Sequence, residues 1–162
     1  MEKILIVSSS RKSKQILIDM VKESGNYQVL DVDSVLQCRE IIKKFNFDLI
    51  IINLPLKDDG GENLSDFLNK NTDSAIILIV KNDITKKLHR VEESGIYVLE
   101  KPLNKLMFIK IIQSHIIHRR RYNFLMEENK KLKNKIRDIK LIDRAKLTLI
   151  QYLNMSEEES HR

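Results

Sequence analysis

The sequence predicts an α/β fold, in which a doubly wound sheet of five parallel strands precedes one long C-terminal helix. Three observations carry this prediction. Strand-like apolar runs and helix-like apolar stripes alternate five times within residues 1–117. The runs are apolar at nearly every position, which is typical of parallel strands buried on both faces. From Asn104 to Leu153 there is neither Gly nor Pro, so nothing in that stretch ends a helix.

Each predicted element rests on a short local pattern. The strands are too short for helices and rich in β-branched residues, and the helices show apolar residues three and four apart. The expected strands are Lys3–Val7, Tyr27–Val32, Asp48–Leu54, Ala75–Val80 and Ile96–Leu99. The expected helices are Lys14–Lys22, a stripe through Val35, Ile41, Ile42 and Phe45, then Leu64–Leu68, Thr85–Glu93 with Gly95 as its C-cap, and a last one opened by Lys101-Pro102.

The composition excludes several classes of protein. An apolar share of 42% is too high for a disordered chain. One cysteine excludes a disulfide framework and a cysteine-based zinc site. The longest apolar runs, such as Ala75–Val80, are far shorter than a membrane helix, and the N-terminal run is too short for a signal peptide. We therefore expect a cytoplasmic protein.

The positive charge is concentrated near the C-terminus. Residues 1–117 carry 17 basic and 16 acidic residues, whereas residues 118–162 carry 12 and 7, so the second part holds +5 of the net charge of +6. Such a segment suits a polyanion, most often a nucleic acid, although the same charge also suits a solvated helix surface.

The long helix has a heptad pattern that predicts a parallel homodimer. One core position holds His115, Tyr122, Asn129 and Ile136, and the other holds His118, Leu125, Leu132 and Ile139. A single Asn at such a position favours a two-stranded parallel coiled coil. A roughly 50-residue helix, about 75 Å long, needs a partner. The alternative is an extended helix packed on another module.

The pattern changes after Ile139. Ile142, Leu149, Ile150 and Leu153 form a wider stripe, which suits a helical bundle. Ser156 and Glu159 then have the spacing of a capping box, which predicts that a new helix begins there. Because the sequence stops three residues later, we expect the chain to be cut inside a domain.

Ligands of a doubly wound sheet bind beyond the carboxyl ends of its strands, so the residues there are the candidate site. These are Ser8 and Ser9, Asn53, Val80, and Lys101.

Other polar residues are expected to have structural roles or to face solvent. The acids Asp58 and Asp59 are expected to be surface turn residues, and Asp31 and Asp33 are expected to be helix-capping and solvent residues. Cys38 is expected to be a small buried side chain. The four histidines have no partners at metal-binding spacing, so neither a metal nor a cofactor is predicted.

Residues 1–117 resemble the receiver domain of two-component response regulators, which has the flavodoxin-like sheet order. The resemblance rests on DLIIINLPLKDDGGENL around the third strand and on EKPL after the fifth. It implies a phosphate-accepting Asp, an acidic pair for Mg²⁺, a hydroxyl residue and a Lys. Here the acceptor position is Asn53, the acidic pair is Ser8-Ser9 and the hydroxyl position is Val80, so only Lys101 is retained. The family's switch aromatic would fall near Val98, with Tyr97 one residue away.

These replacements predict that the usual phosphorylation does not occur. An amide does not act as the nucleophile that forms an acyl phosphate. Mg²⁺ prefers carboxylate oxygens, and two hydroxyls bring no negative charge. The side chain of Val80 cannot donate a hydrogen bond to a phosphoryl oxygen, and Lys101 has lost its acidic partners. It is expected to face Asn53 or solvent.

The C-terminal segment KIRDIKLIDRAKLTLIQYLNMSEEESHR resembles the first half of an ANTAR domain, an RNA-binding antiterminator module. The resemblance rests on Ile142–Lys146, the following apolar stripe and Met155–Ser160, although Leu147 and Ser160 depart from the family's Gly and Ala. It implies three parts: a degenerate receiver at 1–117, a coiled-coil linker at 118–140 and a partial ANTAR domain at 141–162. Four cations are candidate RNA contacts: Arg137, Lys140, Arg144 and Lys146.

The favoured interpretation is a non-enzymatic response regulator that acts as a transcription antiterminator. Its expected partners are structured mRNA, a second copy of the chain through Tyr122, Leu125, Asn129, Leu132 and Ile136, and an upstream signalling protein, with no membrane. The first alternative is a docking and dimerisation module that does not bind RNA. An enzyme or phosphotransfer protein is the least favoured interpretation.

Overall fold

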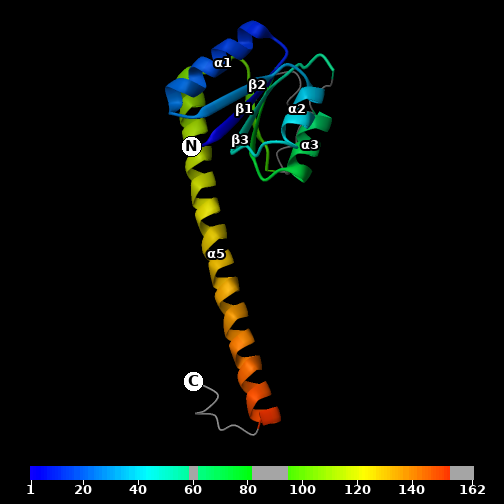
Figure 1. Cartoon of the computed structure of the whole chain (residues 1–162). Helices are drawn as coiled ribbons and strands as arrows, with labels where there is room; N and C mark the ends of the chain where they lie inside the picture. The colour runs from blue at the N-terminus through cyan, green and yellow to red at the C-terminus, as the bar shows by residue number, and fades with distance from the viewer. Residues whose placement is uncertain (59–61, 82–94, 154–162) are drawn as a thin grey trace. The chain divides into compact units, whose positions relative to one another are not determined.

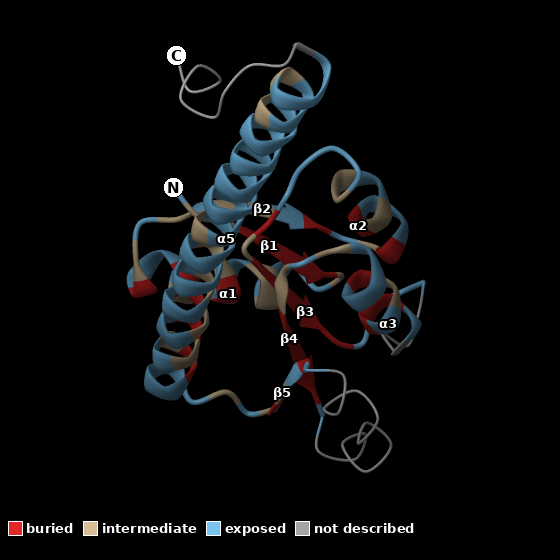
Figure 2. Cartoon of the chain, turned by 90° about the horizontal axis from the view of Figure 1, so that it is seen from below, coloured by how far each residue is buried: buried red, intermediate tan, exposed pale blue. Residues whose placement is uncertain are grey.

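The fold was analysed in a computed structural model, which describes residues 1–58, 62–81 and 95–153. The chain is drawn in Figure 1; five strands form one parallel sheet in the order β2-β1-β3-β4-β5, and all five are labelled in Figure 2. Their bounds are β1 Lys3–Ser8, β2 Gln28–Val32, β3 Leu49–Asn53, β4 Ala75–Val80 and β5 Tyr97–Glu100. This confirms the predicted doubly wound, flavodoxin-like sheet, and places the ends of β1 and β3 side by side.

Four helices belong to the described residues: α1 Arg11–Ser24, α2 Val35–Ile41, α3 Glu62–Asn71 and α5 Lys105–Leu153. The predicted helix at Thr85–Glu93 and the predicted capping box at Ser156–Glu159 lie outside the described residues. Gly95, expected to be a helix C-cap, has a φ of 81°, a conformation that glycine adopts without strain.

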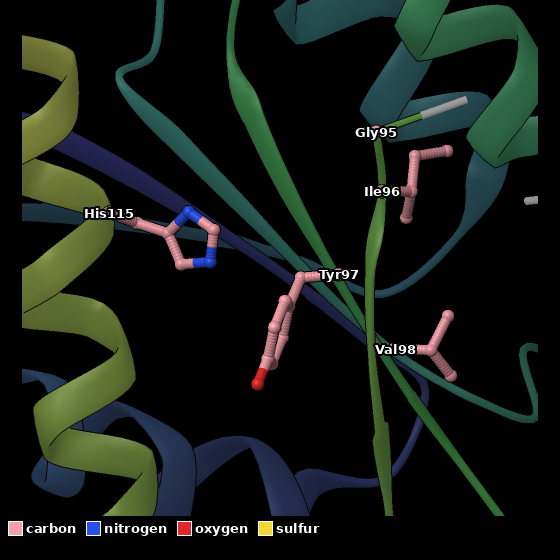
Figure 3. A pocket seen from close by; sticks show the side chains of 5 residues that line it. All are labelled: Gly95, Ile96, Tyr97, Val98 and His115. Atoms are coloured by element: carbon pink, nitrogen blue, oxygen red, sulfur yellow. The ribbon is translucent and has the colours of Figure 1, made fainter. Parts of the chain in front are cut away.

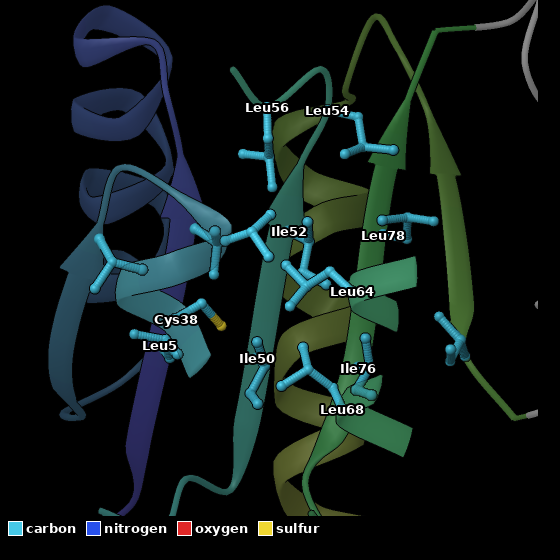
Figure 4. Packing of buried hydrophobic residues seen from close by; sticks show 14 of the residues in the cluster. Leu5, Cys38, Ile50, Ile52, Leu54, Leu56, Leu64, Leu68, Ile76 and Leu78 are labelled. Carbon is cyan, nitrogen blue, oxygen red and sulfur yellow. The ribbon is translucent and has the colours of Figure 1, made fainter. Parts of the chain in front are cut away.

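Both faces of the sheet are covered, which explains why its central strands β1, β3 and β4 are apolar at nearly every position (Figure 2). On one face α2 and α3 pack through Cys38, Leu64 and Leu68 against Ile50 and Ile52 (Figure 4). On the other face α1 and the first turns of α5 pack, through Leu17, Val21, Phe108, Ile112 and Ile116. Alternate residues of each strand therefore enter opposite cores.

Helices α1 and α3 extend two or three residues beyond both predicted ends, and two further predicted helix boundaries are wrong. The last helix begins at Lys105 rather than at Lys101-Pro102, because the Asn104 carboxamide accepts a hydrogen bond from the Met107 N–H at 3.0 Å and so acts as the N-cap. Helix α2 ends at Ile41 rather than near Phe45, since the N–H groups of Lys44 and Phe45 both donate to the Ile41 carbonyl and form a turn.

The chain divides into two compact units, Met1–Arg119 and Arg120–Arg162. The continuous helix α5 contributes to both. Its first turns are part of the core around the sheet, whereas from Arg120 to Tyr152 no described side chain is buried. None of the helices described here is both long and apolar enough to span a membrane.

Candidate functional site

The ends of β1 and β3 hold a buried polar pair. Ser8 and Asn53 are register partners, and both side chains point to the face covered by α1 and α5. The Asn53 amide Nδ2 donates to the Ser8 hydroxyl at 2.9 Å, and the two residues are 5% and 0% exposed. The pair brings an amide and a hydroxyl together at the predicted acceptor position, so it offers neither a nucleophilic carboxylate nor a charged metal ligand.

Ser9 has a different role from Ser8. Its hydroxyl donates to the Asp33 carbonyl at 2.8 Å and accepts from the Lys57 N–H at 3.1 Å. It thus joins the loop after β2 to the loop after β3. Because the hydroxyl is engaged with backbone groups on both sides, Ser9 helps to hold the two loops together.

Val80 lies away from this polar pair. Its side chain is fully buried in the core shared with α2 and α3, while its carbonyl accepts from the Lys101 N–H at 2.8 Å. The predicted hydroxyl position therefore contributes packing and a backbone contact between β4 and the end of β5.

Lys101 is half-buried, and its ammonium donates to the Leu54 carbonyl at 2.5 Å. Burial, together with the nearby charge of Lys81, lowers the pKa of Lys101. Among the described residues no carboxylate forms an ion pair with Lys101. Of the two predicted surroundings of Lys101, Asn53 or solvent, the structure shows that Lys101 and Asn53 line the same cavity. Lys81, which the sequence pattern did not single out, adds a second positive charge here.

The cavity beside this lysine has a volume of about 290 Å³. Its polar wall is formed by Asn53, Lys101 and the α1 residue Ser13. The rest of the lining is apolar and comes from Ile16, Leu17, Met20, Pro102 and Leu103. The cavity thus lies between α1, the end of β3 and the segment that leads into α5.

The acidic residues near this edge are engaged elsewhere. Asp31 and Asp33 both form ion pairs with Lys14 of α1, the first at 2.7 Å. Both side chains are exposed to solvent, as expected, but the expectation that they cap a helix is wrong, because Ser34 is the N-cap of α2 and accepts from Gln37. The ammonium of Lys14 holds the pKa of Asp33 below its usual value.

Asp58 is more than the surface turn acid expected from sequence. Its two carboxylate oxygens accept from the N–H groups of Val35 and Leu36, at 3.1 and 3.3 Å. These are the first residues of α2, so Asp58 caps that helix from a distant loop. The Val35 hydrogen bond is the main cause of its lowered pKa. Asp59 lies outside the described residues.

A second cavity, of about 410 Å³, lies beside β5 and is drawn in Figure 3. The His115 and Tyr97 side chains point toward each other, and their ring centroids lie 5.4 Å apart in an edge-to-face arrangement. Burial and the neighbouring His118 lower the pKa of His115. Because His115 packs within its own chain, its predicted place in the dimer seam is wrong.

Cys38 is buried, as predicted, and burial raises the pKa of its thiol to about 12.

Over residues 1–58, 62–81 and 95–153 no group of three or more His, Cys, Asp or Glu side chains could hold a metal ion.

The predicted dimer and RNA residues all lie on α5 beyond Arg119. We name the predicted dimer contact the apolar seam. Its five side chains are all exposed: Tyr122, Leu125, Asn129, Leu132 and Ile136. Arg137, Lys140 and Arg144 are also exposed, whereas Lys146 is half-buried and has an interaction partner. A groove of about 380 Å³ lies nearby on the same helix, between Arg120, Arg121, Phe124 and Leu125.

Comparison with known proteins identifies the fold. No protein-family model matches the chain, and no curated protein matches it in sequence. Solved structures do match. The signal receiver domain of an HD domain-containing protein from Pseudomonas fluorescens Pf-5 has a TM-score of 0.67 and 19% identity, over 75% of this chain and 91% of that one.

Two further solved structures also match the chain. A response regulator receiver domain protein from Clostridium thermocellum has a TM-score of 0.67 and 18% identity, over 74% of this chain and 98% of that one. A two-component response regulator from Clostridium difficile has a TM-score of 0.64 and 22% identity, over 72% and 96%. The structural neighbours of the chain are thus response regulator receiver domains, and the chain has their fold.

Proposed function

We propose that this protein is a signalling regulator of the response-regulator type, whose receiver-fold unit works without phosphorylation and whose helix α5 binds structured RNA as a dimer, so that it acts as a transcription antiterminator. The observation that carries the RNA-binding part is a stripe of exposed cations on α5, beside the apolar seam. We name it the basic stripe; it consists of Lys130, Lys133, Arg137, Lys140 and Arg144.

The spacing of these residues puts them on one side of the helix. At about 100° per residue the five cations fall within about 80° of arc. The apolar seam also covers about 80°, and its centre lies about 80° from that of the stripe. A second copy can therefore cover the seam while Lys130, Arg137 and Arg144 remain accessible to phosphates, and Lys133 and Lys140 lie at the edge of the interface. Dimerisation doubles the number of cations along one RNA, which favours binding to a polyanion.

The receiver-fold unit supports a regulatory role without phosphoryl transfer. The Asn53–Ser8 hydrogen bond occupies the position where a phosphate-accepting carboxylate would stand, and Ser9 bonds to backbone groups. Because Asn53, Ser8 and Ser9 replace the acceptor carboxylate and the acidic pair, we infer a non-enzymatic, cytoplasmic protein whose input is a partner protein or a bound molecule.

The test is binding of the 162-residue chain to a labelled RNA hairpin, measured at two salt concentrations. Arg137→Gln with Lys140→Gln should weaken binding and reduce the slope of log affinity against log salt by about one for each phosphate that is no longer neutralised. Lys131→Gln with Lys135→Gln is the matched control. It removes the same charge, but from the side of α5 about 160° from the stripe, and it should have little effect.

Two outcomes contradict the proposal. If both double variants weaken binding equally, the helix attracts RNA only through its net charge. If the chain does not bind the hairpin even at low salt, the RNA-binding part is wrong.

A second candidate function is a docking and dimerisation module that does not bind RNA. The observation that favours it is the groove at Phe124 and Leu125, whose exposed apolar side chains lie next to Arg120 and Arg121. A groove of this kind suits an apolar segment of a protein partner. A dimer whose affinity for RNA is negligible would favour this function over the first.

A further inference from the structure

We propose that the cavity between α1, the end of β3 and the segment before α5 binds a small organic carboxylate with an apolar body. We name it the α1–α5 cavity; it is lined by Ser13, Ile16, Leu17, Met20, Asn53, Lys101, Pro102 and Leu103. The proposal concerns only the receiver-fold unit, and it is independent of whether α5 binds RNA.

The polar end of the cavity can hold an anion. Lys101 uses one N–H of its ammonium on the Leu54 carbonyl, and Asn53 uses one amide N–H on Ser8. Both groups have a further N–H to donate. A carboxylate placed between them would accept charge-assisted hydrogen bonds from both side chains.

The local charge also favours an anion. Lys81 lies close enough to Lys101 to disfavour its charged form, and burial acts in the same direction. Asp31 of β2 and Asp33, which follows that strand, lie at the same edge of the sheet and are paired with Lys14. No carboxylate among the described residues neutralises Lys101, so a negatively charged ligand would relieve an unfavourable charge.

The apolar walls of the cavity favour a ligand that carries an apolar group in addition to its negative charge. Five of the eight lining residues are apolar, from α1 and from the Pro102-Leu103 segment. Ile16 is 45% exposed although it lines the cavity, so a bound apolar group would cover it. A volume of about 290 Å³ suits a single ring or a short branched chain.

The experiment is a titration of ¹⁵N-labelled chain with benzoate, phenylacetate and isovalerate, followed by amide shifts of the lining residues. At least one carboxylate should shift Ser13, Ile16, Asn53 and Leu103, with a Kd of roughly 1 mM or less. Benzamide, which lacks the charge, and inorganic phosphate, which lacks the apolar body, should each bind at least about tenfold more weakly.

Three variants test the location. Lys101→Met removes the charge but keeps an unbranched side chain, and Ile16→Trp fills the cavity from an exposed position; each should raise the Kd at least about tenfold. Lys105→Met is the matched control, because Lys105 lies four residues further on, pairs with Glu23 at 2.7 Å and does not line the cavity. It should leave the Kd unchanged.

The result that overturns the proposal is a lack of shifts at the lining residues with all three carboxylates. Benzamide binding as tightly as benzoate would show that the cavity does not recognise the charge, and phosphate binding as tightly would show that it does not use its apolar walls. Either result overturns the stated ligand class. Spectra of each variant without ligand verify that the fold is intact.

Discussion

At the scale of single residues, one hydrogen bond joins the carboxyl ends of β1 and β3. The Asn53 amide donates to the Ser8 hydroxyl, with both groups almost fully buried. Because the amide donates to the hydroxyl and the hydroxyl donates in turn to the Ser10 carbonyl at 3.4 Å, the pair forms without a metal or a phosphoryl group. The sequence indicated which residues stand here, but not that they bond to each other.

The first prediction concerns Asn53→Asp. A carboxylate at this position has no acidic neighbours to hold Mg²⁺, because Ser8 and Ser9 are hydroxyls. Incubation with acetyl phosphate and Mg²⁺ should therefore leave the intact mass of both the wild type and this variant unchanged. A phosphorylatable response regulator in the same buffer is the positive control. A stoichiometric, base-labile phosphate on either protein contradicts the prediction.

A second prediction concerns Asp58→Asn. It weakens the cap at Val35 and Leu36, so Tm at neutral pH should fall by roughly 2–4 °C. The folded-state pKa of Asp58 is lowered, so its contribution is present above the unfolded pKa of about 4 and is lost as the pH falls through the folded value. The difference in Tm should shrink accordingly below about pH 4.

The matched control for this cap is Asp66→Asn, an exposed acid on α3 for which no hydrogen bond or ion pair is described. Thermal melts of the three proteins, from neutral to acidic pH, provide the measurement. Equal losses in Tm for the two variants would show that Asp58 acts by charge alone.

At the scale of elements, α5 has two consecutive roles. Up to Ile116 the apolar residues on one side of α5, Phe108, Ile112 and Ile116, enter the core, and beyond Arg119 none of its described apolar residues is buried. The heptad pattern runs through both parts, which is why sequence reasoning assigned His115 to the seam. Its packing on Tyr97 depends on a strand that is distant in sequence, and periodicity along one helix does not report such a contact.

The third prediction is that α5 forms a parallel dimer through the apolar seam. In that arrangement Glu128 of one copy faces Lys133 of the other, which is attractive, although Lys135 then faces Lys140. Leu125→Asp with Leu132→Asp should give a monomer by sedimentation, since two charges would enter the seam. Asn134→Asp with Leu141→Asp, at exposed positions about 150° from the centre of the seam, should remain dimeric.

The orientation has its own measurement. In a parallel dimer the two copies of residue 129 face each other, so Asn129→Cys should form an interchain disulfide on mild oxidation. Cys38 is buried and should not interfere. A wild-type chain that sediments as a monomer at high concentration excludes the dimer, and a dimer without this disulfide excludes only the parallel orientation.

At the scale of the whole molecule, the sequence was informative where local pattern decides structure. The β3 and β4 strands were found because they are apolar at every position, and α5 because nothing interrupts it. Contacts between distant segments were missed: Asp58 to the start of α2, Lys14 to Asp31, and the charge of Lys81 near Lys101. These depend on how loops close, which neither periodicity nor composition encodes.

The last prediction follows from the division of the chain at Arg119. The sheet and its helices share a core, whereas residues 120–152 have no described buried side chain, and an isolated helix without tertiary packing is marginal in water. We therefore predict that dimerisation through the apolar seam stabilises that part of α5. Amides there should exchange with deuterium faster at low protein concentration than at high, because dilution favours the monomer.

Amides of β1, β3 and β4 should exchange slowly and at a rate independent of concentration, since their protection comes from the core of a single chain. The Leu125→Asp, Leu132→Asp variant should show fast exchange beyond Arg119 at every concentration. Slow, concentration-independent exchange over residues 120–152 of the wild type would mean that α5 is stabilised within one chain, and that the seam is not the reason it remains helical.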